Sequence, residues 1–160
     1  MPAAPSPTRL RRDWERFRAL PYGRRLFSAL FGVSVPYSGT VRPRILELAP
    51  GRAVIAMEDR RRVRNHLASI HAIALANLGE MATGLALAYA LPPGARTIMK
   101  GLHAEYLKKA RGTITATAQA PLVDAVERVV PVTAELADAS GAVVARVTVD
   151  WLVGAHRRPS

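Results

Sequence analysis

The feature that most constrains the fold is a long apolar stretch, residues 67–91, in which Glu80 is the only charged side chain. Apolar and small residues occupy nearly every side of a helix here, so we expect a buried helix over residues 69–90. Its many alanines and glycines would let the backbone lie close against a sheet. Burying a carboxylate on such a helix costs free energy unless the group has a bonding partner or a functional role. Glu80 is therefore the first candidate functional residue.

The same stretch is long enough to span a membrane, and the arginines before it would suit a cytoplasmic flank. The polar residues His71, Asn77 and Glu80 lie inside it and argue against that alternative, because a glutamate near the midplane of a bilayer is expensive. The strand-like segments that follow also need a helix to cover their apolar face. We therefore expect the helix to lie in a protein core.

Segments with the period of two that is typical of strands lie on both sides of the expected helix. Two precede it, at residues 41–48 and 53–57, and the turn dipeptide Pro50-Gly51 joins them. The segments that follow the helix are residues 97–107, 112–119, 129–137 and 143–151. Short turns between neighbouring strands predict an antiparallel sheet, and one helix against one such sheet is an α+β layout.

The N-terminal part of the chain predicts a helical flank. Residues 9–31 indicate two short helices broken at Pro21, because proline cannot continue a helix interior. Packing on the chain's own domain is the favoured interpretation of their apolar spacing, and a membrane-surface or partner-binding segment is the alternative. The expected organisation is a disordered tail (1–8), a helical flank (9–32), a main domain (33–153) and a C-terminal tail (154–160).

The composition is strongly basic, with a formal net charge of +11 from 23 lysines and arginines against 12 acidic residues. A basic surface favours anionic partners. Nucleic acid is not expected, because the basic residues are split between several clusters and only 3 phenylalanines are available for base stacking. The absence of cysteine excludes disulfides, a thiolate nucleophile and cysteine-ligated zinc. With no signal-peptide pattern in the first residues, we expect a cytoplasmic protein.

Glu80 and its neighbours form a candidate site. Desolvation should raise the pKa of Glu80, whose carboxylate could act as a general base or a nucleophile; a structural glutamate bonded to a neighbouring chain or to the backbone is about equally plausible. Asn77, Glu80 and Thr83 recur every three residues, so Asn77 and Thr83 could hold Glu80 in place. His71 lies nine residues before Glu80, about half a turn out of phase, so these two side chains would not meet on one straight helix.

Groups near the start of the expected helix could complete the site. Unpaired backbone N–H groups, such as that of Ala72, suit an oxyanion or a polarised carbonyl. Asn65 could orient a water or bind substrate, and a structural role in its loop has equal weight. For His71 alone, a packing or helix-start role is at least as plausible as a catalytic one.

Two basic clusters flank this site in sequence, namely the run Arg60–Arg64 and the group Lys108, Lys109 and Arg111. Both could hold phosphates, although solvated charge on loops is the better interpretation for any single residue. His103 and Glu105 face the same way on one expected strand, but spacing supplies no third ligand, so no metal site is predicted.

These residues, taken in order, resemble a known family. The chain resembles the hotdog-fold thioesterase superfamily, in particular its phenylacetyl-CoA-thioesterase-like branch, and is most similar to a bacterial hotdog family of unknown function. The resemblance covers roughly residues 22–153 and rests on Pro36-Tyr37, Leu48-Ala-Pro-Gly51, Arg64-Asn-His66, His71-Ala72, Asn77-Leu-Gly-Glu80 and Tyr106-Leu-Lys-Lys-Ala-Arg-Gly112. It implies an antiparallel sheet wrapped around one long central helix, in agreement with the predicted element order.

The resemblance also implies hydrolysis of an acyl-CoA thioester at a subunit interface, in a homodimer or homotetramer. The motif of the branch is an asparagine, a histidine-glycine pair and an acid nine residues after the histidine, and Asn65, His71 and Glu80 hold these positions. It implies that the Ala72 N–H polarises the thioester carbonyl, that Glu80 from the second subunit activates water or attacks directly, and that Asn65 orients water or substrate. Coenzyme A would enter only as part of the substrate.

Two positions depart from that motif. Ala72 stands where glycine is usual and adds a methyl group close to the thioester path, and Glu80 stands where this branch often has aspartate, although related branches use glutamate. The branch often places a serine or threonine after the helix to hold the water, and Thr97 is the nearest candidate. The other substrate-binding candidates are Asn77, Thr83, Arg64, Lys109 and Arg111. The sequence thus predicts an acyl-CoA thioesterase; the alternative, motivated by Ala72, is a non-catalytic acyl- or acyl-CoA-binding hotdog protein.

Overall fold

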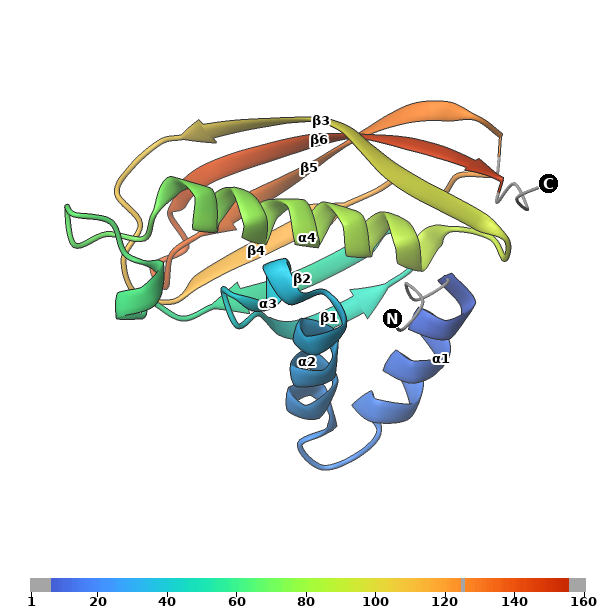
Figure 1. Cartoon of the computed structure of the whole chain (residues 1–160), viewed down its shortest axis with the longest axis horizontal. Helices are drawn as coiled ribbons and strands as arrows, with labels where there is room; N and C mark the ends of the chain where they lie inside the picture. Colours follow the sequence, from blue (N-terminus) through green and yellow to red (C-terminus); the bar gives the residue numbers. More distant parts are fainter. Residues whose placement is uncertain (1–6, 125, 156–160) are drawn as a thin grey trace.

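A computed structural model describes residues 7–124 and 126–155, and in it one long helix lies across the concave face of a single sheet (Figure 1). The helices are α1 (Pro7–Arg18), α2 (Gly23–Ser34), α3 (Pro36–Gly39) and α4 (Ala72–Ala90), with a short 3-10 turn at Arg61–Val63. The strands are β1 (Arg44–Ala49), β2 (Arg52–Met57), β3 (Ala95–Tyr106), β4 (Ile114–Gln119), β5 (Arg128–Ala137) and β6 (Val143–Ala155).

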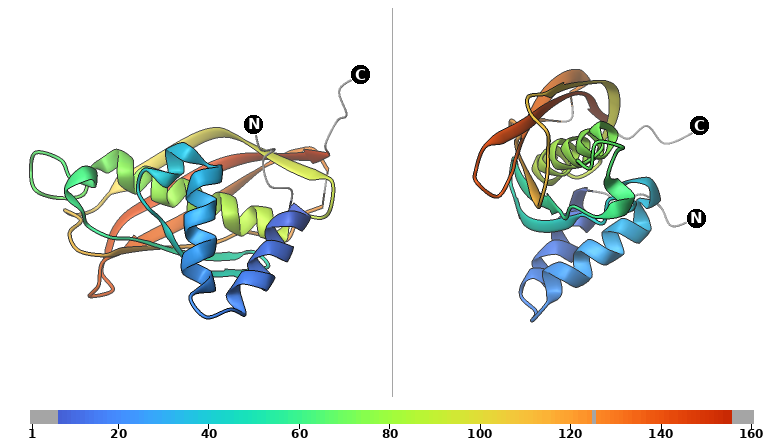
Figure 2. Two further views of the ribbon diagram at one scale, coloured as in Figure 1. Left: turned by 60° about the horizontal axis from the view of Figure 1, so that its bottom comes forward. Right: turned by 90° about the vertical axis from the view of Figure 1, so that its left-hand side faces the viewer.

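The six strands follow the order β1-β2-β4-β5-β6-β3, and every neighbouring pair is antiparallel. Seen along α4, the sheet curves around the helix, while α1 and α2 lie outside it beneath β1 and β2 (Figure 2). The predicted α+β hotdog architecture is therefore confirmed, including the six strands and the long helix between the second and third. Strand β3 returns from the end of α4 to form one edge of the sheet.

Small residues allow α4 to approach the sheet closely. A Cβ atom at Gly79 would lie 2.5 Å from the side chain of Val147, and one at Gly84 would lie 3.0 Å from the Trp151 ring. Any larger residue at Gly79 would push the helix off the sheet. By length and composition α4 could cross a membrane, but 67% of it is buried inside the protein, as expected for a core helix.

The N-terminal flank packs on the domain that follows it. Leu10 and Trp14 of α1 are buried, and Arg11 donates hydrogen bonds to the main-chain carbonyls of Tyr89 (2.5 Å) and Leu91 (2.7 Å). These carbonyls lie at the C-terminal end of α4, where a cation is favourable because the last turn leaves carbonyls unpaired. Packing on the chain's own domain, the favoured interpretation of this segment, matches the structure.

Several boundaries differ from the sequence prediction. Helix α4 begins at Ala72 rather than at residue 69, and the short helix α3 was not predicted. Strand β1 begins at Arg44 rather than at residue 41, because Arg42 has a positive φ of 50° that is incompatible with an extended strand.

The described residues extend into both segments that were expected to be tails. Residues 1–6 of the expected tail lie outside the described residues, and Pro7 already belongs to α1. At the other end, Gly154 and Ala155 pair with Arg96 and Ala95 of β3, which extends β6 into the expected C-terminal tail; residues 156–160 lie outside the described residues.

Candidate active site at the start of helix α4

His71 caps the N-terminus of α4. Its backbone is extended (φ −65°, ψ 138°), and its Nδ1 atom accepts a hydrogen bond from the N–H of Ile73 at 3.1 Å. In the neutral imidazole this leaves the proton on Nε2, which can donate outward, since the side chain is exposed. His71 thus has the helix-start role that the sequence left open, and its capping bond explains why the helix begins one residue later.

Ala72, the first residue of α4, presents a backbone N–H that has no acceptor among the described residues. This is the normal state of the first turn of a helix, whose N–H groups have no intrahelical partner and carry partial positive charge. The carbonyl of the same residue accepts a hydrogen bond from the Tyr106 hydroxyl at 3.0 Å. This bond restrains the peptide between Ala72 and Ile73, which is next to the peptide that carries the Ala72 N–H. The Ala72 N–H itself remains available to an oxygen atom that bears negative charge.

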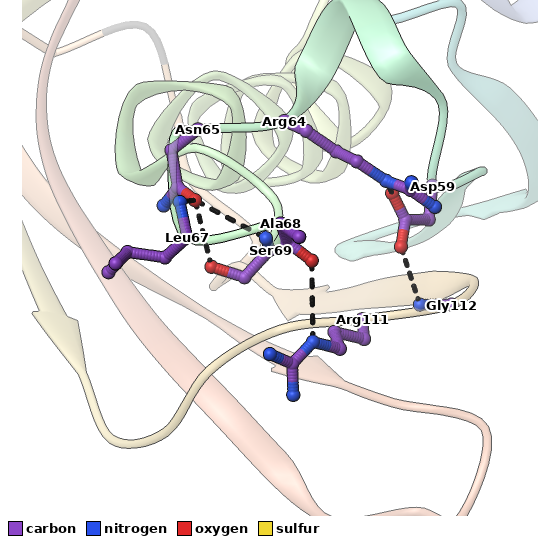
Figure 3. A network of polar contacts seen from close by, with 8 residues as sticks. All are labelled: Asp59, Arg64, Asn65, Leu67, Ala68, Ser69, Arg111 and Gly112. Atoms are coloured by element: carbon purple, nitrogen blue, oxygen red, sulfur yellow. Dashed lines mark hydrogen bonds and ion pairs between the residues drawn. The ribbon is translucent and has the colours of Figure 1, made fainter.

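Asn65 organises the loop that leads into α4 (Figure 3). Its Oδ1 atom accepts hydrogen bonds from the N–H of Leu67 (2.9 Å), the N–H of Ser69 (3.3 Å) and the hydroxyl of Ser69 (3.1 Å). This fan of bonds supports the turn in which Ala68 adopts a positive φ of 53°. The structural role considered for Asn65 is therefore present, while its Nδ2 amide has no partner among the described residues and can still donate to a ligand.

A second set of bonds ties this loop to the turn after β3 (Figure 3). Asp59 accepts from Arg64 at 2.6 Å and from the N–H of Gly112 at 3.1 Å, while Arg111 donates to the carbonyl of Ala68 at 3.3 Å. The hydrogen bond from Arg64 lowers the pKa of Asp59, and that carboxylate raises the pKa of Arg64. Arg64 and Arg111 therefore brace the loop, and each uses its Nε atom to do so.

Two shallow hollows flank the first turn of α4. One, of about 200 Å³, is lined by Asn65, Ala72, Tyr106 and Lys109 among others. The other, of about 240 Å³, includes Arg64, His71 and Asn77 in its wall. The structure thus brings together Asn65, Ala72 and Lys109 in one hollow and places His71 and Asn77 in the other.

Glu80 lies outside both hollows. It follows Ala72 by eight residues, which is about 12 Å along a helix axis. Its side chain is half-buried, and burial raises its pKa as predicted. No hydrogen bond or ion pair engages its carboxylate within residues 7–124 and 126–155. A half-buried carboxylate without a partner is the kind of group that marks functional sites.

Asn77 and Thr83 do not hold the Glu80 carboxylate, contrary to the prediction. The Asn77 amide lies 3.5 Å from the carbonyl of Tyr37. The Thr83 hydroxyl donates to the main-chain carbonyl of Glu80 at 2.8 Å and accepts from the indole N–H of Trp151 at 3.2 Å. Thr83 is 0% exposed, because it lies on the side of α4 that faces the sheet, so it cannot contact a substrate.

Thr97 and Tyr106 lie near opposite ends of β3. Thr97 pairs with Val153 near the end of α4 and lies roughly 30 Å along the strand from Tyr106, so within one chain it does not approach Ala72. Tyr106 is the site residue that sequence reasoning missed. It begins one of the motifs that carried the resemblance, but nothing local indicates that its hydroxyl reaches a residue 34 positions away. Burial raises the pKa of Tyr106, which keeps the hydroxyl protonated as a donor.

One stripe of α4 is left less covered than the rest of the helix. It includes Ile73, which is exposed, and Glu80 and Gly84, which are half-buried. The adjacent edge strand β3 exposes the apolar side chains of Ile98 (49%) and Met99 (47%). An unpaired apolar edge beside an incompletely covered helix is a typical place for another chain to bind.

Comparison with known proteins agrees with this architecture. The family model described as Domain of unknown function (DUF4442) matches residues 23–153. A search of curated proteins gives no significant match. A crystal structure described as genomics APC5556 is similar over 91% of this chain and 98% of its own, with 29% identity and a TM-score of 0.80.

Two further crystal structures with lower identity show the same fold. A mutant of the thioesterase enzyme SAV0944 from Staphylococcus aureus is 18% identical, with 74% of this chain and 98% of that chain covered and a TM-score of 0.67. A mutant of the phenylacetic acid degradation protein PaaI from Thermus thermophilus is 23% identical, with 73% and 97% covered and a TM-score of 0.63.

Proposed function

The chain belongs to the hotdog family described as Domain of unknown function (DUF4442), and on this basis we propose that it hydrolyses acyl-CoA thioesters at a site completed by a second subunit. The observation that carries the proposal is the combination on one helix of a free Ala72 N–H and an unpartnered, half-buried Glu80 carboxylate. The thioesterase enzyme SAV0944, which has the same fold, supports this class of reaction.

One subunit does not bring the two groups onto the same thioester. Ala72 and Glu80 are about 12 Å apart along the axis of α4 and about 80° apart around it. A two-fold contact between two copies of α4, centred near Ala76, would place Ala72 of one copy opposite the second copy's Glu80, and the reverse. The less covered stripe of α4 and the apolar edge of β3 support such a contact, which would create two equivalent sites.

In the proposed reaction the thioester carbonyl oxygen accepts a hydrogen bond from the Ala72 N–H, with the Asn65 amide as a second donor. Glu80 removes a proton from a water molecule, which attacks the carbonyl carbon. The oxyanion then collapses, the carbon–sulfur bond breaks, and the thiolate of coenzyme A takes up the proton. Direct attack by Glu80, followed by hydrolysis of the resulting anhydride, is the alternative route to the same acid and thiol.

Lys109 is the basic residue best placed to contact the phosphates of coenzyme A. It lines the hollow that contains Ala72 and has no partner among the described residues, whereas Lys108 pairs with Asp138 at 2.8 Å. Arg64 and Arg111 contribute indirectly, by bracing the Asn65 loop. A cytoplasmic location, a homodimeric or homotetrameric state, and a reaction without any cofactor beyond the substrate's coenzyme A remain part of this proposal.

The test is release of free coenzyme A from a panel of straight-chain, branched and aromatic acyl-CoA substrates. We expect turnover by the wild-type protein and its loss, by at least about a hundredfold, in Glu80→Gln, because the amide cannot accept the proton. Glu135→Gln is the matched control, since Glu135 pairs with Arg146 on the exposed face of the sheet. Equal activity in Glu80→Gln and wild type would refute the proposal.

The second candidate function, a non-catalytic acyl-CoA-binding protein, is favoured by the methyl group of Ala72. Wild-type protein that binds acyl-CoA without hydrolysis, together with turnover gained in Ala72→Gly, would establish it. The two functions are thus separated by a binding measurement and a rate measurement on the same pair of proteins.

A further inference from the structure

A third hollow lies away from the start of α4, between α2, α3 and the start of β1. Its volume is about 670 Å³, which exceeds that of either hollow at α4 and falls in the range of small-molecule sites. It shares no lining residue with those two hollows. Whatever it binds is therefore independent of the proposed thioester chemistry.

The charge of this hollow is strongly unbalanced. Three arginines, Arg25, Arg42 and Arg44, line it together with a single acid, Glu58. Glu58 is engaged by Arg44 at 3.2 Å, and neither Arg25 nor Arg42 has an acidic partner within the described residues. The Cζ atom of Arg25 lies 5.9 Å from the centroid of the Tyr22 ring, so two of the three arginines that line the hollow have no carboxylate partner.

The backbone holds Arg42 at the rim in an uncommon conformation. Its φ of 50° lies in the left-handed region, which an arginine rarely adopts, and its N–H donates to the Gly39 carbonyl at 2.9 Å. Arg60 lies close by: burial lowers its pKa, and the charge of Arg42 lowers it further. Glu58 acts on Arg60 in the opposite direction, so this one acid stands against several arginines around Arg42 and leaves an excess of positive charge.

The hollow also has apolar lining residues. They are Ala29 and Val33 from α2 and Pro43, and Val33 is 77% exposed. A valine so exposed gains little from folding, whereas it would be covered by a hydrocarbon group in the hollow. The lining therefore combines cationic and apolar side chains.

We propose that this hollow binds an organic phosphate monoester that carries an apolar substituent. Guanidinium groups bind phosphate oxygens in pairs with charge-assisted hydrogen bonds, which would satisfy Arg25 and Arg42, while the substituent would lie against Val33 and Pro43. The same chemistry occurs in a soluble alkyl phosphate and in the headgroup of an anionic phospholipid.

The experiment is titration calorimetry of the full-length chain with decyl phosphate below its micelle concentration, and with inorganic phosphate. We expect decyl phosphate to bind, inorganic phosphate to bind at least about tenfold more weakly, and both to weaken as salt is added. Arg42→Gly, which removes the guanidinium while retaining a residue suited to a positive φ, should lose at least about tenfold in affinity, as should Arg25→Gln. Arg146→Gln is the control and should bind as wild type does.

Cosedimentation with vesicles separates the two sources of phosphate. Capture by phosphatidic acid but not by phosphatidylcholine vesicles, lost in Arg42→Gly, identifies a lipid headgroup as the ligand. Binding of decyl phosphate without vesicle capture identifies a soluble ester. The proposal is overturned if decyl phosphate does not bind, if inorganic phosphate binds equally well, or if folded Arg42→Gly and Arg25→Gln variants bind like wild type.

Discussion

The hydroxyl of Tyr106 donates a hydrogen bond to the main-chain carbonyl of Ala72, 3.0 Å away. The bond joins the end of strand β3 to the first turn of helix α4, so the edge strand that would meet a second subunit also restrains the residue whose N–H is proposed to bind the thioester. The proposed interface and the proposed site are thus linked through one hydrogen bond.

Removing that bond should affect turnover more than stability. In Tyr106→Phe we expect the unfolding free energy to fall by about 1 kcal/mol, because the bond is partly exposed, and the rate of thioester hydrolysis to fall severalfold, because the first residue of α4 loses a restraint on its carbonyl group. Denaturant titration and steady-state kinetics measure the two effects. Tyr22→Phe, at a tyrosine that is 80% exposed, is the control.

The Ala72 N–H can be removed without removing the helix. Proline is tolerated at the first helical position, and the extended backbone of His71 (φ −65°, ψ 138°) is compatible with a following proline. Ala72→Pro should therefore fold normally and lose hydrolysis, whereas Ala72→Gly should retain or increase it. Circular dichroism and coenzyme A release are the measurements, and a fully active Ala72→Pro would exclude this N–H from the reaction.

Mixing two inactive variants tests whether the site is shared. If each site takes Ala72 from one subunit and Glu80 from the other, a heterodimer of Ala72→Pro and Glu80→Gln has one intact site. Random mixing of equal amounts should then restore about a quarter of wild-type activity. The measurement is the rate of coenzyme A release after the two variants are refolded together. If each site were confined to one subunit, the mixture would stay inactive.

The raised pKa of Glu80 predicts two pH effects of opposite sign. Activity should rise with pH through a midpoint above the ordinary value of 4.5, because only the carboxylate accepts a proton. Stability should fall over the same interval, since the folded state holds the proton more tightly than the unfolded state does. Glu80→Gln should therefore be more stable than wild type at neutral pH and equal to it well below pH 4.5, as measured by urea denaturation.

Thr83 should matter for stability and hardly for catalysis. Thr83→Val leaves the buried indole N–H of Trp151 without an acceptor, which should cost about 1–3 kcal/mol of unfolding free energy with little change in turnover. Combining it with Trp151→Phe should cost less than the sum of the two single changes, because no orphaned donor remains. Urea denaturation of the three variants checks this, and a large loss of turnover in Thr83→Val would contradict it.

Most of the fold follows from local sequence patterns. The apolar segment 67–91 predicts the long helix, the alternation of apolar residues predicts the strands, and Pro50-Gly51 predicts the turn between the first two strands. These predictions are possible because side-chain direction repeats every 3.6 residues in helices and every two in strands. The short helix α3 and the start of β1 were missed, since the positive φ of Arg42 leaves no signal in residue type.

The site was less predictable than the fold. Residue type and order indicated Asn65, Ala72 and Glu80 as candidates, and the half-turn phase difference correctly kept His71 apart from Glu80. Spacing wrongly suggested that Thr83 supports the Glu80 carboxylate, because a helix buried on nearly all sides gives no sequence signal for which face meets the sheet. Only the packed structure shows Thr83 bonded to Trp151.

The sequence alone determined that an acid would lie on a core helix whose start is polar, because charge, apolar content and periodicity are properties of neighbouring residues. The tertiary structure decided that His71 caps this helix, that Asn65 and Arg64 fix the loop before it, and that Tyr106 binds the Ala72 carbonyl. These are contacts of side-chain atoms with precise backbone positions, some of them distant in sequence, and such contacts are set by how the helix and the sheet pack together.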